Sequence, residues 1–267
     1  MEKKWFVALL MVVVMMCACW TGAVADEERK TFTSGDYQYA LLDDGTVEIA
    51  GYKGSADLLA IPAELDGKAV TSIGDCAFYL CSSLTSVSIP DSVEQIGTNP
   101  FAACSALKTI SVSPEHLYFA TIDGVLFRKA DKALISYPAG IKSSTYTIPQ
   151  GIAAIGDGAF YSCYSLTSVF IPDSVTSIGD SAFAFCSSLT SVSIPDSVTS
   201  IGDGAFYSCY HLTSVSIPDS VTSIGDSAFY YCFILTLTVP RNSYALEYAK
   251  TNNIPYTYPD ANDWLNN

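Results

Sequence analysis

The chain has 267 residues, of which 27 are acidic and 13 are basic, so its formal net charge is −14 at pH 7. Such an acidic surface repels nucleic acids and anionic membranes, and no basic run offsets it. We therefore expect no nucleic-acid partner. Length alone leaves open one elongated domain or two compact ones.

The first 25 residues have the layout of a secretory signal peptide. A basic lead at residues 1–4 precedes an apolar run at residues 5–19 and a small-residue stretch ending at Ala25. This layout predicts cleavage after Ala25, a secreted product and no membrane attachment after cleavage. Two alternatives stay open. One is a retained anchor, for which the run is short against a span of roughly 20 residues. The other is a lipoprotein site at Cys19.

A repeat of 23 residues dominates the rest of the chain. Its copies begin at Ile61, Ile89, Ile148, Ile171, Ile194 and Ile217, and the first of them is lengthened around residues 65–68. The copies at Ile89, Ile171, Ile194 and Ile217 are preceded by a Leu-x-x-Leu-x-Leu spacing, as in Leu189, Val192 and Ile194. A fixed period of roughly 20 to 29 residues with this spacing is the signature of a leucine-rich repeat.

Each copy can be interpreted physically. Val192 and Ile194 alternate with serines, which predicts a short strand with one buried face. Pro195 lacks a backbone donor and ends that strand. Gly202 permits a sharp bend, and Asp203 is placed to cap a short helical turn. We therefore predict an α/β repeat solenoid with one short parallel strand per coil of about 23 residues and short helical turns opposite.

The recurring pattern Ile-Pro-x-x-Val-x-x-Ile-Gly-x-x-Ala-Phe-x-x-Cys-x-x-Leu resembles the BspA-like (Treponema-type) leucine-rich repeats. Residues 37–49 resemble the hairpin that often precedes such repeats. The resemblance implies a secreted or surface-attached protein that binds host or neighbouring-cell proteins. The predicted parts are a signal peptide (1–25), an N-terminal capping hairpin (26–60), a solenoid (61–240) with a hairpin insert (110–148), and a C-terminal helical cap and tail (241–267).

Two polar side-chain types also follow the period. Six cysteines share one register: Cys81, Cys104, Cys163, Cys186, Cys209 and Cys232. This spacing favours an inward ladder of buried thiols, with a disulfide from Cys76 to Cys81 or Cys104 as the alternative. Aspartates follow the glycine (157, 180, 203, 226) and the proline (173, 196, 219). We assign them to caps and turns in preference to a row of calcium sites.

The chain shows no sequence sign of catalysis or of a bound cofactor. Its two histidines, His116 and His211, are isolated, and neither CxxC nor Cys/His pairing occurs. Nucleophile, zinc-protease and phosphate-loop motifs are also absent from the sequence. We therefore expect neither an enzyme nor a metal or cofactor site.

The candidate contact residues fall in three places. The outward strand positions form a Ser/Thr strip that lacks anchors other than Phe170. The turns are richer in aromatic residues, and the insert carries two adjacent cations. The seven candidates are Arg128, Lys129, Tyr164, Phe170, Tyr207, Tyr210 and Tyr230. The expected partner of this monomer is a host-matrix or microbial surface protein, or else a glycan. The alternative function is a structural spacer with no ligand.

Overall fold

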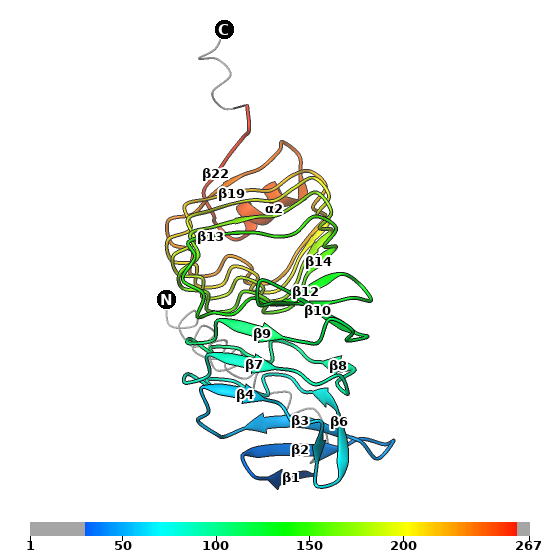
Figure 1. Cartoon of the computed structure of the whole chain (residues 1–267). Helices are drawn as coiled ribbons and strands as arrows, with labels where there is room; N and C mark the ends of the chain where they lie inside the picture. The colour runs from blue at the N-terminus through cyan, green and yellow to red at the C-terminus, as the bar shows by residue number, and fades with distance from the viewer. Residues whose placement is uncertain (1–29, 261–267) are drawn as a thin grey trace.

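The computed structural model describes residues 30–260 as a solenoid of stacked coils. Strand β1 lies at one end, and helix α2 closes the other end (Figure 1). The predicted signal peptide lies outside the described residues. Apolar side chains fill the inside of the coils in two adjoining clusters, one N-terminal and one C-terminal. This arrangement is the predicted repeat solenoid.

Each regular coil contributes two short strands, one to each of two sides of the solenoid. On the first side the strands form a three-stranded and a six-stranded parallel sheet. The first strands are β4 (Leu58–Ala60), β7 (Ser86–Ser88), β9 (Thr109–Ser111), β13 (Thr145–Thr147), β15 (Ser168–Phe170), β17 (Ser191–Ser193), β19 (Ser214–Ser216) and β21 (Thr236–Thr238). The second strands include β8 (Gln95–Ile96), β14 (Ala154–Ile155), β16 (Ser177–Ile178), β18 (Ser200–Ile201) and β20 (Ser223–Ile224). The expectation of one strand per coil is therefore wrong, because the glycine-preceding Ser-Ile pair also joins a sheet.

The register of the parallel strand pairs repeats the sequence period on both sides of the coils. On the first side Val192 pairs with Val215, and on the second Ile178 pairs with Ile201. Equivalent residues of neighbouring coils therefore lie side by side. Because of this register, any side chain that recurs in the sequence forms a row along the solenoid.

The N-terminal end is an antiparallel sheet that passes into the coils. It consists of β1 (Thr31–Ser34), β2 (Tyr37–Leu41) and β3 (Val47–Tyr52). Asp44 stabilises the turn between β2 and β3, since its carboxylate accepts from the Thr46 N–H at 2.9 Å. Strand β3 then pairs in parallel with β6 (Lys68–Ile73), which also pairs with the short β5 (Glu64–Leu65).

The insert interrupts the regular coils with three antiparallel strands. These are β10 (Phe119–Ile122), β11 (Val125–Arg128) and β12 (Ala133–Ser136). Strand β12 then pairs in parallel with β14 and so starts the second sheet of the C-terminal coils. On β11, Leu126 packs into the N-terminal core cluster and Phe127 into the C-terminal one. The insert therefore joins the two clusters.

The side of each coil that carries the Ala-Phe pair is a tight turn, not a helical turn. In every regular coil, one residue two positions before the Phe and one residue two positions after it have positive φ. The pairs are Cys76 and Leu80, Asn99 and Ala103, Gly158 and Ser162, Ser181 and Phe185, Gly204 and Ser208, and Ser227 and Tyr231. The expected helical turns are wrong because left-handed residues break a run of helical hydrogen bonds.

One α-helix occurs within residues 30–260. Helix α2 (Tyr244–Thr251) covers the open end of the last coil, and the Ser243 hydroxyl caps it by accepting from the Leu246 N–H at 3.1 Å. Strand β22 (Tyr256–Thr257) follows and pairs with β21. Over the same residues, no helix is long and apolar enough to cross a membrane.

A stack of phenyl rings runs through the C-terminal core. The ring centroids of Phe160, Phe183, Phe206 and Phe229 follow one another at 4.8, 5.1 and 5.2 Å, with nearly parallel planes. All four rings are buried. Stacked rings of this kind contribute beyond the apolar area that they bury. The Phe at this repeat position is therefore a central core residue of each coil.

The cysteine ladder lies beside the phenyl stack. The thiols of Cys186, Cys209 and Cys232 donate to phenylalanine carbonyls of preceding coils at 3.0, 3.2 and 3.1 Å. Burial raises the pKa of Cys163 and of Cys209. The six ladder cysteines are free thiols, as the buried-ladder interpretation expects.

The alternative disulfide is wrong. Cys76 is disulfide-bonded, but Cys81 and Cys104, its two expected partners, are free. The Cys104 thiol donates to the Phe78 carbonyl at 3.0 Å, as other ladder cysteines do in later coils. Neither thiol is therefore engaged with Cys76.

The aspartates after the glycine form a second ladder, between coils. Asp157, Asp180 and Asp203 each accept, through one carboxylate oxygen, the backbone N–H of the equivalent aspartate in the next coil, at 2.8, 2.7 and 2.8 Å. The expectation that they cap helical turns is wrong, because each carboxylate reaches along the solenoid. Among residues 30–260, no cluster of three His, Cys, Asp or Glu side chains suits a metal ion.

The aspartate ladder predicts opposite effects for two substitutions of Asp180. Burial raises the pKa of Asp180, and the charges of Asp157 and Asp203 raise it further. Asp180→Asn keeps the acceptor and removes the disfavoured charge, so we expect it to stabilise the fold at pH 7. Asp180→Ala removes the acceptor and should cost about 1 kcal/mol.

Urea unfolding at several pH values checks both expectations. A pKa that is raised in the folded chain means that stability falls as pH rises above the unfolded value of 3.8. The advantage of Asp180→Asn should therefore be present above about pH 4 and disappear below it. An advantage that grew on acidification would contradict this account.

Candidate binding surface

The strand face is a flat strip of small hydroxyl side chains. Ser191, Ser193, Ser214 and Ser216 all point outward and are exposed. Phe170 stands among them with 59% of its surface exposed, as expected for an outward strand position. A shallow pocket of about 420 Å³ lies between Phe170 and the serines of β17. Phe170 is thus the large exposed side chain among the serines of β15, β17 and β19, and on β4 of the same row Leu58 is also exposed.

A continuous row of aromatic rings lies along the turns of the C-terminal coils. We call it the aromatic edge, and it comprises Tyr161, Tyr164, Phe185, Tyr207, Tyr210, Tyr230, Tyr231 and Phe233. Ring centroids link Tyr161 to Phe185 at 5.2 Å, Phe185 to Tyr207 at 5.6 Å, Tyr207 to Tyr231 at 5.5 Å, Tyr231 to Phe233 at 5.6 Å and Tyr210 to Phe233 at 6.2 Å. The row spans neighbouring coils and so forms one surface.

Three of the predicted aromatic candidates lie on the outside of this edge. Tyr164, Tyr210 and Tyr230 are exposed. Tyr207 is different, since only 1% of its surface is accessible and burial raises its pKa to about 12. The rings of Tyr230 and Tyr231 in the next coil cover it. Tyr207 therefore supports the edge from below, and its assignment as a direct contact residue is wrong.

The most exposed ring of the edge belongs to the aromatic turns recognised in the sequence but is not one of the seven candidates. Phe233 is 73% exposed, and its neighbour Ile234 is also exposed. They occupy the repeat positions that hold Tyr210 and His211 one coil earlier. The signal was present in the sequence, because an apolar pair at this point departs from the polar residues of most other copies.

The two basic side chains of the insert, Arg128 and Lys129, both bind other groups of the chain. The Arg128 guanidinium pairs with both carboxylate oxygens of Asp131, at 2.7 to 3.1 Å, and lowers the pKa of that carboxyl group. The Lys129 ammonium donates to the His116 carbonyl at 2.6 Å. The exposed apolar residues of the insert, Leu117 and Ile122, were not singled out from the sequence.

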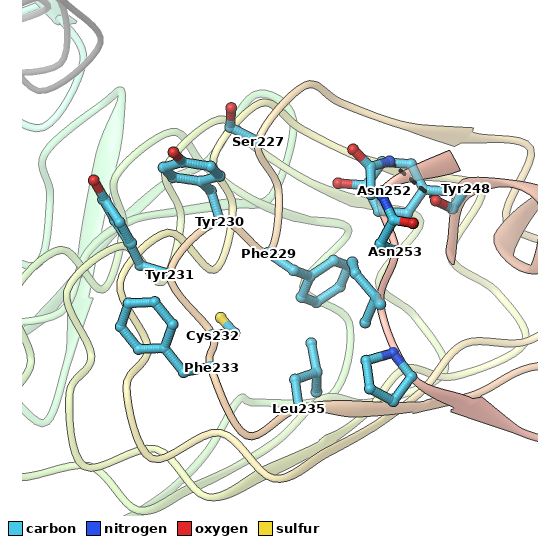
Figure 2. Close-up of a pocket in the computed structure, with 12 residues that line it drawn as sticks. Ser227, Phe229, Tyr230, Tyr231, Cys232, Phe233, Leu235, Tyr248, Asn252 and Asn253 are labelled. Atoms are coloured by element: carbon cyan, nitrogen blue, oxygen red, sulfur yellow. Dashed lines mark hydrogen bonds between the residues drawn. The ribbon is translucent and has the colours of Figure 1, made fainter. Parts of the chain in front are cut away.

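A pocket of about 450 Å³ opens at the C-terminal end of the aromatic edge. Figure 2 shows Tyr230, Tyr231 and Phe233 on one side of it and Asn252 and Asn253 on the other. The first side belongs to the turn of the last coil, and the second follows helix α2. Phe229 lies between them.

These features define a leucine-rich-repeat solenoid with exposed aromatic turns. The model of the BspA-type leucine-rich repeat region, with six copies, matches residues 64–143 and 136–253. The chain therefore belongs to the BspA-type leucine-rich repeat family. No curated protein matches the chain.

Solved structures of similar fold come from several bacteria. A leucine-rich repeat protein from Eubacterium ventriosum is 19% identical, with a TM-score of 0.55, over 79% of this chain and 84% of that one. A leucine-rich cell surface protein from Faecalibacterium prausnitzii is 23% identical, with a TM-score of 0.47, over 84% and 98%. The T. pallidum leucine-rich repeat protein is 27% identical, with a TM-score of 0.41, over 87% and 99%. The first of these supports the fold alone.

Proposed function

We propose that this chain is a secreted or surface-associated, non-catalytic protein that binds other proteins through its aromatic edge. The observation that carries the proposal is the exposure of large rings on neighbouring turns, above all Phe233 and Tyr210. Aromatic side chains of this kind dominate the binding energy of protein interfaces. The Ser/Thr strip offers few such anchors.

Packing within the chain does not require the outer rings of the edge. The phenyl stack already fills the C-terminal core at Phe160, Phe183, Phe206 and Phe229. A buried apolar surface is stabilising by roughly 25 cal/mol per Å², whereas an exposed ring contributes little to the fold. The outer rings are therefore free to bury their surface against a partner.

The charge of the chain favours a particular kind of partner. With a net charge of −14, it attracts surfaces that carry lysine and arginine. Cations of this kind also bind over tyrosine rings. We propose a basic host-matrix or microbial surface protein, reached after export directed by residues 1–25. Binding should weaken as salt is raised.

A capture experiment tests this proposal. The chain and its Tyr210→Ser/Phe233→Ser variant are immobilised and exposed to host-matrix and microbial surface proteins. We expect retained proteins to bind the variant at least about tenfold more weakly, because two anchors are removed.

Phe170→Ser is the matched control, since it removes an exposed ring from the strand face. It should leave capture unchanged. Equal capture by the chain and the edge variant would contradict the proposal, and capture lost through Phe170→Ser would place the contact on the strip. A chain that retains nothing at all would favour the alternative role of a structural spacer.

A further inference from the structure

The C-terminal pocket exists because the last coil lacks a successor. In coils that are followed directly by another regular coil, the N–H of the residue two positions after the core Phe donates to a carbonyl of the next coil. Phe185 donates to Tyr207 and Ser208 to Tyr230, at 2.8 and 2.9 Å. The equivalent residue of the last coil is Tyr231, and within residues 30–260 its N–H has no acceptor.

Helix α2 replaces the missing coil only in part. The Tyr248 ring of the helix packs edge-on against the Phe229 ring of the last coil, with centroids 6.2 Å apart. The chain then leaves the helix through Asn252 and Asn253, which lie across the opening from Tyr231 (Figure 2). Tyr231, whose N–H has no acceptor among residues 30–260, therefore lines one wall of the pocket.

The pocket lining combines ring faces with neutral polar groups. Tyr230, Tyr231 and Phe233 present rings in mutual contact, with centroids 4.4 and 5.6 Å apart. On the facing wall, the Asn252 amide nitrogen donates to the Tyr248 carbonyl at 3.0 Å, which leaves its oxygen as an acceptor. The Asn253 side chain has no hydrogen-bond partner among the described residues. No lining residue carries a charge.

We infer that this pocket binds a neutral sugar residue, such as the end group of a glycan. A sugar ring has C–H faces that pack against aromatic rings and hydroxyls that bond to amides and to a backbone N–H. An anionic ligand would meet no cation among the lining residues. A purely apolar ligand would leave the amides and the Tyr231 N–H unpaired at a cost.

The dimensions of the pocket agree with a small ligand. Its volume of about 450 Å³ lies within the range of pockets that hold small molecules. The pocket is partly open to solvent, as an end group of a longer chain requires. The pocket shares Tyr230, Tyr231 and Phe233 with the aromatic edge, whereas Asn252 and Asn253 lie outside that edge, so a substitution of Asn253 tests the pocket separately from the proposed protein contact.

The alkylation rate of Cys232 can report whether the pocket holds a ligand. Cys232 lines the pocket and is half-buried, whereas the five other free cysteines among the described residues are buried. The rate of its alkylation by iodoacetamide, followed by mass spectrometry, reports access to the pocket. A bound sugar should slow that rate.

The test uses the full chain with glucose, galactose, mannose and N-acetylglucosamine, and with N-acetylneuraminic acid as the anionic probe. We expect at least one neutral sugar to bind by ligand-observed NMR and to slow Cys232 alkylation, while the anionic probe does neither. Asn253→Gly should weaken binding about tenfold.

Asn242→Gly is the matched control. Both asparagines are exposed and have positive φ, 55° for Asn253 and 63° for Asn242, so glycine preserves the backbone in each case. The control should bind the sugar as the unchanged chain does. The inference is overturned if no neutral sugar binds at millimolar concentration, if the anionic probe binds equally well, or if both variants lose binding alike.

Discussion

Phe183→Ala is expected to cost about 3–5 kcal/mol of unfolding free energy. Its ring is fully buried between Phe160 and Phe206, with centroids 4.8 and 5.1 Å away. Truncation removes the stacking on both sides and leaves a cavity that neighbouring coils cannot fill without losing register. Each coil contacts mainly its neighbours. The loss should therefore also make the coils before Phe183 unfold less cooperatively with the coils after it.

Urea unfolding followed by circular dichroism measures the effect. Phe170→Ala serves as the control, since that ring is 59% exposed and its removal should change stability by less than about 0.5 kcal/mol. If the two substitutions had equal effects, the phenyl stack would not be a main determinant of stability.

Gly202→Ala is expected to destabilise the chain by about 1–3 kcal/mol, through overpacking. A Cβ atom at this position would meet the Asp180 backbone nitrogen at 2.5 Å and the Gly179 carbonyl carbon at 2.6 Å. These are backbone atoms of the preceding coil, so neither can move aside without disturbing the sheet. The glycine is therefore required by the close approach of two coils.

Two controls separate this cause from others. Gly51→Ala should be tolerated, because its Cβ would meet only the flexible Gln38 side chain, at 3.2 Å. Adding Asp180→Ala to Gly202→Ala should not restore stability, because the backbone contacts remain. Recovery in that double variant would show that the aspartate side chain, not the backbone, excludes the methyl group.

The solenoid was predictable because its determinants recur in the sequence. Val192, Ile194 and Cys186 fall on fixed steps, and stacking them in register leaves one arrangement that buries them together. The second strand of each coil was missed because two residues such as Ser200 and Ile201 are too short for a periodicity to be read. The tight turns were missed because residues such as Phe185 seldom adopt positive φ.

The candidate surface was predictable only in part. Tyr207 and Tyr230 occupy the same repeat position, yet one is buried and the other exposed, because only Tyr207 has a further coil above it. A repeat pattern gives the position within a coil, but not which coil is the last. The asparagine wall of the pocket depends on how the chain leaves helix α2, which no repeat encodes.

Hydrogen–deuterium exchange of the chain, alone and with a captured partner, tests the central claim most directly. The account predicts partner-dependent protection at residues 207–211 and 227–235, which form the aromatic edge of the last coils. Protection confined to the outward strands β15, β17 and β19, with the aromatic edge exchanging as in the free chain, would contradict it.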